Sequence, residues 1–150
     1  MLSPIGTLLA MPVRTRPLFS LTLAALIAAM LLAPVALGAA NGTYKGNVVG
    51  DESAEVTVKV KDGKVTKFVA NVYASCGYEN FIITVAYPPV GMQGAKAKIV
   101  NNKFKVVFKG SPDVEDDKRT VTGTFAGKRV TGSIEVEGLC SADVTYAAKR

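Results

Sequence analysis

The sequence predicts an all-β domain: an antiparallel β-sandwich, or a closed or partly open barrel, of about nine short strands with one disulfide. After residue 40, apolar and polar residues alternate with period two, as in strands that bury one face. Turn dipeptides such as Asp62-Gly63 separate these runs, and a 3.6-residue apolar repeat of useful length is absent from them. Short strands with closely spaced turns are typical of both architectures, and the pattern does not decide between them.

The clearest local prediction is a hairpin over residues 55–72. Residues 55–61 alternate strictly, and Asp62-Gly63 accepts the positive φ angles of a type I′ turn. Residues 65–72 then return as the partner strand. The expected buried residues of this hairpin are Val56, Val58, Val60, Phe68, Ala70 and Val72.

Two further hairpins follow the same pattern. Residues 96–99 are expected to turn through Asn101-Asn102 into 104–108, and residues 120–125 through Gly127-Lys128 into 130–136. The core candidates of the last hairpin are Val121, Phe125, Val130, Ile134 and Val136. Gly123 and Gly132 fall at inward positions there, which indicates a close backbone approach or a bulge.

Three more strands complete the set, at residues 43–49, 81–87 and 143–147. Longer connections are expected at 74–80, 88–94 and 110–118.

The first forty residues have a different composition from the rest. Arg14 and Arg16 precede an apolar run over 18–33, and the segment ends in the mostly small residues Ala36-Leu37-Gly38-Ala39-Ala40. A basic flank, an apolar stretch and a small-residue end are the parts of a secretory signal peptide, so we expect residues 1–40 to be removed. The single domain is then 41–150, secreted, periplasmic or at the cell surface, and losing two arginines lowers the net charge from +6 to +4.

Two alternatives concern this segment. Translation from Met11 would give a signal peptide of more usual length. The apolar run from Leu18 through Leu37 is also about 20 residues long, enough to cross a bilayer of roughly 30 Å as an uncleaved anchor. After cleavage we expect no stable membrane span.

Cys76 and Cys140 are the two cysteines of the chain. An even number of cysteines in an exported chain predicts pairing. A disulfide between them closes a loop of about 64 residues, which in the chain-entropy model stabilises the fold by roughly 4 kcal/mol.

A resemblance follows from several short motifs taken in order. Residues 42–46 read Gly-Thr-Tyr-Lys-Gly and residues 60–65 form the first turn. Cys76-Gly77 comes next, then 122–125 and 130–134, and Cys140 precedes the end of the chain. This order resembles small secreted bacterial all-β domains of uncharacterised function that carry a single cystine. Such domains often have Trp near the C-terminus, where this chain has Tyr146, which we expect to fill the same core position. The resemblance implies a β fold with one cystine and no catalytic residues.

Several classes of chemistry are disfavoured by composition. The chain has no histidine, which removes Ser–His and Cys–His catalysis and most zinc, copper and haem sites. Paired cysteines remove thiolate chemistry, and no phosphate-binding or dinucleotide-binding glycine motif is present. We therefore expect a protein that is not an enzyme and has no cofactor; a hydrolase that uses carboxylates is an alternative.

A weak calcium candidate is the acidic segment with Asp113, Glu115, Asp116 and Asp117, because calcium prefers clustered oxygen ligands. Its spacing matches no calcium loop, so we expect a solvated connection and no metal.

Two groups of side chains are candidates for binding. Lys96, Lys98, Lys105 and Lys109 alternate with core residues and are expected on one outer face, where clustered cations attract anionic polymers. Their alternative role is to keep an exposed strand soluble. Tyr73, Tyr78 and Tyr87 flank the expected loops and would form a recognition patch or cap the core.

These observations predict a secreted, non-enzymatic binding or structural module. Its expected partner is an anionic cell-surface polymer or another secreted protein. Nucleic acid is disfavoured because no aromatic stacking set accompanies the lysines. A carrier of a small apolar ligand in a barrel cavity is the alternative.

Overall fold

The computed structural model describes residues 38–110 and 116–150. These residues form nine strands and no helix. The strands are β1 (Gly42–Val48), β2 (Asp51–Lys61), β3 (Lys64–Cys76), β4 (Glu79–Tyr87), β5 (Ala97–Lys98), β6 (Lys103–Lys109), β7 (Lys118–Ala126), β8 (Arg129–Glu137) and β9 (Ala142–Lys149).

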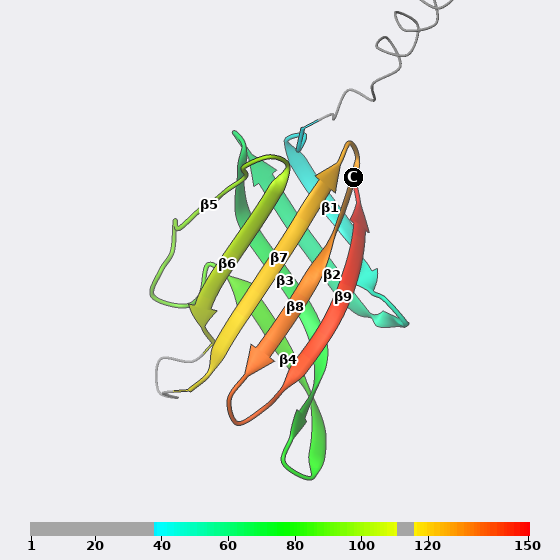
Figure 1. Ribbon diagram of the computed structural model, residues 1–150, viewed down its shortest axis with the longest axis vertical. Helices are drawn as coiled ribbons and strands as arrows, with labels where there is room; N and C mark the ends of the chain where they lie inside the picture. Colours follow the sequence, from blue (N-terminus) through cyan, green and yellow to red (C-terminus); the bar gives the residue numbers. More distant parts are fainter. Residues whose placement is uncertain (1–37, 111–115) are drawn as a thin grey trace, which may run out of the picture. The chain divides into compact units, whose positions relative to one another are not determined.

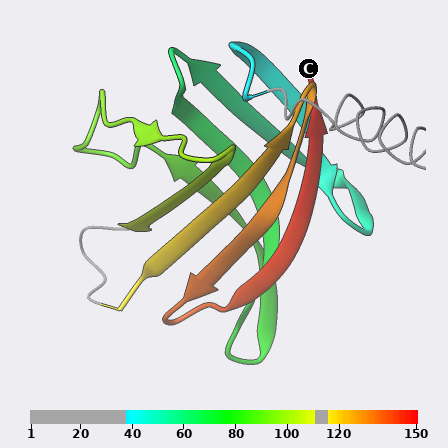
Figure 2. The same cartoon turned by 45° about the horizontal axis from the view of Figure 1, so that its top comes forward.

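The strands form one antiparallel sheet in the order β4-β3-β2-β1-β9-β8-β7-β6, with β5 beside β3. The sheet is strongly curled and forms a half-barrel (Figures 1 and 2). Most neighbours are consecutive in sequence, and the long-range pairing of β1 with β9 joins the two halves of the chain. The all-β prediction is confirmed, and so is the disulfide between Cys76 and Cys140.

The interior of the half-barrel is filled by apolar and aromatic side chains. Tyr44 packs edge-on against Phe125 with ring centroids 5.3 Å apart, and Phe68 against Tyr146 at 5.4 Å. The predicted core residues of the first and last hairpins are buried, and Tyr146 is a core residue as expected. Its hydroxyl donates to the carbonyl oxygen of Thr122 at 2.9 Å, which satisfies the one polar atom that this ring brings into the core.

Both inward glycines of the last hairpin allow a close approach, as predicted. A Cβ on Gly123 would overlap the ring of Phe104 and the hydroxyl of Tyr146. A Cβ on Gly132 would overlap the carbonyl oxygen of Thr122. Gly123 therefore makes room for the Phe104 ring and the Tyr146 hydroxyl, and Gly132 for the backbone of the neighbouring strand β7.

Two expectations about connections are wrong. Residues 74–80 are not a loop, because β3 continues through Cys76 and β4 begins at Glu79. Gly77, with a φ of 69°, provides the left-handed turn between them, and the Ser75–Ser141 bridge supports the extended hairpin. Strand β5 pairs with β3 rather than with β6, although Val100 and Lys103 do form the tight turn expected there.

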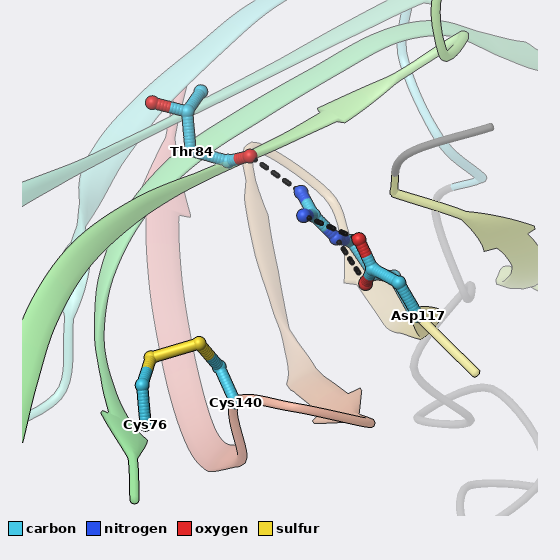
Figure 3. Close-up of polar contacts among 5 residues, drawn as sticks. Cys76, Thr84, Asp117 and Cys140 are labelled. Carbon is cyan, nitrogen blue, oxygen red and sulfur yellow. Dashed lines mark hydrogen bonds and ion pairs between the residues drawn. A yellow bond between two sulfur atoms is a disulfide. The ribbon is translucent and has the colours of Figure 1, made fainter. Parts of the chain in front are cut away.

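Two links join strands β3 and β4 to the other half of the sheet (Figure 3). Arg119 of β7 donates to the carbonyl oxygen of Thr84 of β4 at 2.6 Å, and forms two 3.1 Å hydrogen bonds with Asp117. The Cys76–Cys140 disulfide joins the end of β3 to the connection between β8 and β9. These links hold the β3–β4 hairpin against the opposite half of the sheet.

Residues 1–37, most of the predicted signal peptide, lie outside the described residues. Over 38–110 and 116–150, the structure contains no helix that is long and apolar enough to cross a membrane.

Candidate functional site

The outer face of the sheet carries a continuous diagonal of cationic side chains, which we call the basic band. It crosses six strands, from β5 through β3, β2, β1 and β9 to β8, near the end where the β2–β3 turn and the C-terminus lie (Figure 1). Its eight members are all exposed. They are Lys98, Lys64, Lys61, Lys67, Lys59, Lys45, Lys149 and Arg129.

The first row of the band is built by the turn between β2 and β3. Asp62 and Gly63 adopt φ angles of 53° and 68°, the left-handed conformations of a tight hairpin turn. This turn sets Lys61 opposite Lys64, and the pairing of β5 with β3 sets Lys64 opposite Lys98. Three lysines therefore stand side by side on neighbouring strands.

The second row lies one step further along the same hairpin. Lys59 is opposite Lys67, after a register shift between Lys59 and Val60. Their chain neighbours Val58, Val60 and Phe68 are buried, so the alternation of the strands directs both lysines to the outer face.

The third row joins the two halves of the chain. Lys149 of β9 is opposite both Lys45 of β1 and Arg129 of β8. Lys59 is opposite Thr43, two residues before Lys45. Lys59 and Lys45 are therefore diagonal neighbours, within reach of each other's long side chains. The second row thus continues into the third.

Few acidic groups offset this charge. In the part of the chain that the structure describes there are two ion pairs, Lys118–Glu137 and Arg119–Asp117, and both lie outside the band. Asp62 in the β2–β3 turn and Glu55 on β2 are the nearest carboxylates by strand position. Like charges directly opposite one another destabilise a sheet, so the band opposes folding slightly.

The acidic residues gather towards the opposite ends of the strands. Most of those described lie at the β1–β2 turn, at the β3–β4 turn, near the start of β7 and beside the β8–β9 connection: Asp51, Glu52, Glu79, Asp116, Asp117, Glu135, Glu137 and Asp143. The molecule therefore has a cationic end and an anionic end.

The lysines predicted from sequence are only partly brought together. Lys98 belongs to the band, and Lys96 is exposed just before β5. Lys105 of β6 and Lys98 line one depression of about 510 Å³. Lys109 lies at the other end of β6, opposite Lys118.

The predicted tyrosines do not form one patch. Tyr87 is buried against Phe108, with ring centroids 5.7 Å apart, and burial raises the pKa of its phenol. Tyr73 and Tyr78 are exposed on the β3–β4 hairpin, where Ile82 lies opposite Tyr73.

The acidic segment shows no metal centre in its described part. Asp113 and Glu115 lie outside the described residues, and both carboxylate oxygens of Asp117 accept hydrogen bonds from Arg119. Across residues 38–110 and 116–150, no three His, Cys, Asp or Glu side chains are grouped closely enough to hold a metal ion.

Most of the band was missed by sequence reasoning. The signal for Lys59, Lys61, Lys64 and Lys67 was available, because they alternate with core residues around the predicted turn. The third row had no local signal, since it depends on the pairing of β1 with β9.

Comparison of the chain with protein-family models, with curated proteins and with solved structures gives no match. The resemblance to small secreted bacterial domains therefore stays a prediction.

Proposed function

We propose that this chain is a secreted, non-enzymatic binding module that holds an anionic cell-surface polymer along the basic band. The observation that carries the proposal is the row structure of the band. Five directly opposed cation pairs occupy neighbouring strands: Lys61–Lys64, Lys64–Lys98, Lys59–Lys67, Lys45–Lys149 and Lys149–Arg129.

The in-register placement of these cation pairs favours a role in binding a partner over a role in solubility alone. Scattered lysines suffice to keep a sheet soluble, and opposing them in register adds repulsion without further benefit to the free protein. An anionic partner removes that repulsion, so its binding and the stability of the fold are linked.

The shape of the band suits an extended partner. Six neighbouring strands span five interstrand spacings, or about 24 Å along the sheet. Cations repeat along this length on strands β5, β3, β2, β1, β9 and β8, so one polymer segment would meet several of them at once. Each exposed contact is weak and screened by salt, and affinity then depends on their number.

The filled interior supports an outer binding face. Tyr44, Phe68, Phe125 and Tyr146 occupy the inside of the half-barrel, where a carrier would hold an apolar ligand. The carrier of an apolar ligand therefore has less support than the polymer-binding module.

The experiment measures binding of the purified protein to immobilised dextran sulfate, with uncharged dextran as the reference surface. A band variant combines Lys59→Glu, Lys64→Glu and Lys149→Glu, and each new carboxylate faces one or two cations of the band. A control variant carries the same charge change on β6, as Lys103→Glu, Lys105→Glu and Lys109→Glu.

We expect the band variant to lose at least tenfold in affinity, because three cations of the band become anions. It should still fold normally, since its opposed cross-strand pairs become attractive. The control should lose much less, and binding of the native protein should weaken as salt rises. Equal losses in the two variants would mean that net charge alone matters, and would overturn the proposal.

A further inference from the structure

A depression on the outer face lies at the third row of the band. It has a volume of about 570 Å³, within the roughly 300–1,000 Å³ typical of small-ligand sites. It runs over β1, β9 and β8, from the cationic row towards Val49.

The floor of this depression consists of small residues. Ala147 lies at its centre, opposite Asn47 of β1 and Thr131 of β8. Gly46 and Ala148 also line it. A Cβ on Gly46 would overlap the backbone of Ala147, so β1 and β9 approach closely here. Gly46 and Ala148 occupy inward positions of their strands, so the small outward side chain of Ala147 is what leaves the hollow between Asn47 and Thr131.

Two neighbouring rows of the depression differ in chemistry. Lys45, Lys149 and Arg129 form the cationic rim, and in the next row the amide of Asn47 and the hydroxyl of Thr131 flank Ala147 on its two sides. No carboxylate side chain lines this depression. The Asn47 amide nitrogen donates to the carbonyl oxygen of Glu52 at 2.5 Å, which fixes the side chain at the edge of the hollow.

Such a site distinguishes ligands by shape as well as charge. A bare anionic chain needs only the cations of the rim. A ring that carries hydroxyl groups gains hydrogen bonds with the amide and the hydroxyl, and it needs the small floor beneath it. Arg129 adds a planar donor group suited to a carboxylate or a sulfate ester.

We infer that this depression is a subsite for a saccharide unit that carries an anionic group. The anion lies against Lys45, Lys149 and Arg129, and the sugar ring lies over Ala147. The inference rests on the proposed function and narrows its partner from any anionic polymer to an anionic polysaccharide. The anionic group is either a uronate carboxylate or a sulfate ester.

The test compares three probes: oligogalacturonate, sulfated dextran oligosaccharide, and polyphosphate, which has no sugar. Ala147→Phe fills the hollow and leaves every cation of the band in place. Asn80→Phe, at an exposed position of β4, is the control for adding a ring to the sheet surface.

We expect Ala147→Phe to lower the affinity for at least one saccharide probe tenfold or more, with polyphosphate affinity changed less than twofold. The saccharide that loses affinity identifies the anionic group. Asn80→Phe should change neither the saccharide affinity nor the polyphosphate affinity. If Ala147→Phe fails to fold, Thr131→Val removes the hydroxyl beside Ala147 at nearly constant volume and should lower saccharide affinity alone.

Equal effects on saccharide and polyphosphate, or none on either saccharide, would overturn the subsite. A different result would contradict the proposed function itself: binding of polyphosphate by the band variant as tightly as by the native protein.

Discussion

Lys59 of β2 lies directly opposite Lys67 of β3, and both side chains are exposed on the outer face of the sheet. Among the described residues, neither of these two lysines forms an ion pair with a carboxylate. The sheet therefore retains a local repulsion that one substitution on either strand would reverse.

The first prediction separates folding from binding at this pair. Lys67→Glu places a carboxylate opposite Lys59, so we expect the melting temperature at low salt to rise, because a repulsive cross-strand pair becomes attractive. Affinity for dextran sulfate should fall at the same time. Thermal denaturation and binding measured on the same sample check this, and Lys67→Gln gives the effect of removing charge alone. A variant that loses both stability and affinity would mean that the lysine has a structural role.

The second prediction concerns the buried hydroxyl of Tyr146. Tyr146→Phe removes its hydrogen bond and leaves the Thr122 carbonyl without that donor, so we expect a loss of about 1–3 kcal/mol in the free energy of unfolding at pH 7. Urea denaturation measures this loss. Tyr44→Phe is a matched control, because its hydroxyl donates to the Ala40 carbonyl at 2.8 Å near the domain's edge and should cost less.

The same residue predicts a dependence on alkaline pH. Burial raises the pKa of the Tyr146 phenol in the folded state above its ordinary value of 10.0. Above about pH 10 the unfolded chain loses this proton and the folded chain keeps it, so stability falls as pH rises. The decline between pH 9 and 11 should be shallower in Tyr146→Phe. Identical slopes in the two proteins would contradict this assignment.

The third prediction concerns the disulfide. Replacing Cys76 and Cys140 together by Ser opens a link between residues 64 positions apart, and should lower the free energy of unfolding by about 4 kcal/mol. Dextran sulfate affinity of the folded variant should stay within twofold, because the cystine lies at the anionic end. Urea denaturation and binding measure the two effects. A large loss of affinity in protein that is still folded would show that the band depends on the β3–β4 hairpin.

The fourth prediction concerns the contact between β7 and β4. Arg119→Gln removes the ion pair with Asp117, whose two side chains are 14% and 15% exposed, and the exposed hydrogen bond to the Thr84 carbonyl. We expect a loss of roughly 1–3 kcal/mol, with faster amide hydrogen exchange in β4 than in β8. Asp117→Asn keeps the link to Thr84 and should leave the exchange of β4 closer to native. Uniform acceleration in all strands would instead indicate a general loss of stability.

Local pattern was enough to predict the strands and much of the core. Val56, Val58 and Val60 alternate with polar residues, and a sheet with one buried face admits only one orientation for such a run. The turn between β2 and β3 requires two residues with positive φ angles, and Asp62-Gly63 is a dipeptide that adopts them readily.

Long-range pairing had no such local signal. Lys45 and Lys149 are opposite each other although 104 positions separate them. Neither segment contains a local pattern that identifies the other as its partner strand. The pairing of β5 with β3 was missed for the same reason, because the adjacent 104–108 strand offered an equally plausible local partner. The lysine face expected from sequence therefore lies on the hairpin of residues 96–99 and 104–108, whereas the charges converge on the β2–β3 and β1–β9 pairs.

The most direct test of the basic band is a titration of the isotopically labelled protein with a short sulfated dextran oligosaccharide, followed by amide chemical shifts in NMR spectra. We predict that the largest shifts occur at the eight band residues and their neighbours on β5, β3, β2, β1, β9 and β8, and that they diminish as salt is added. Shifts confined to β6 or to the β3–β4 hairpin would contradict the account, as would binding with no localised shifts.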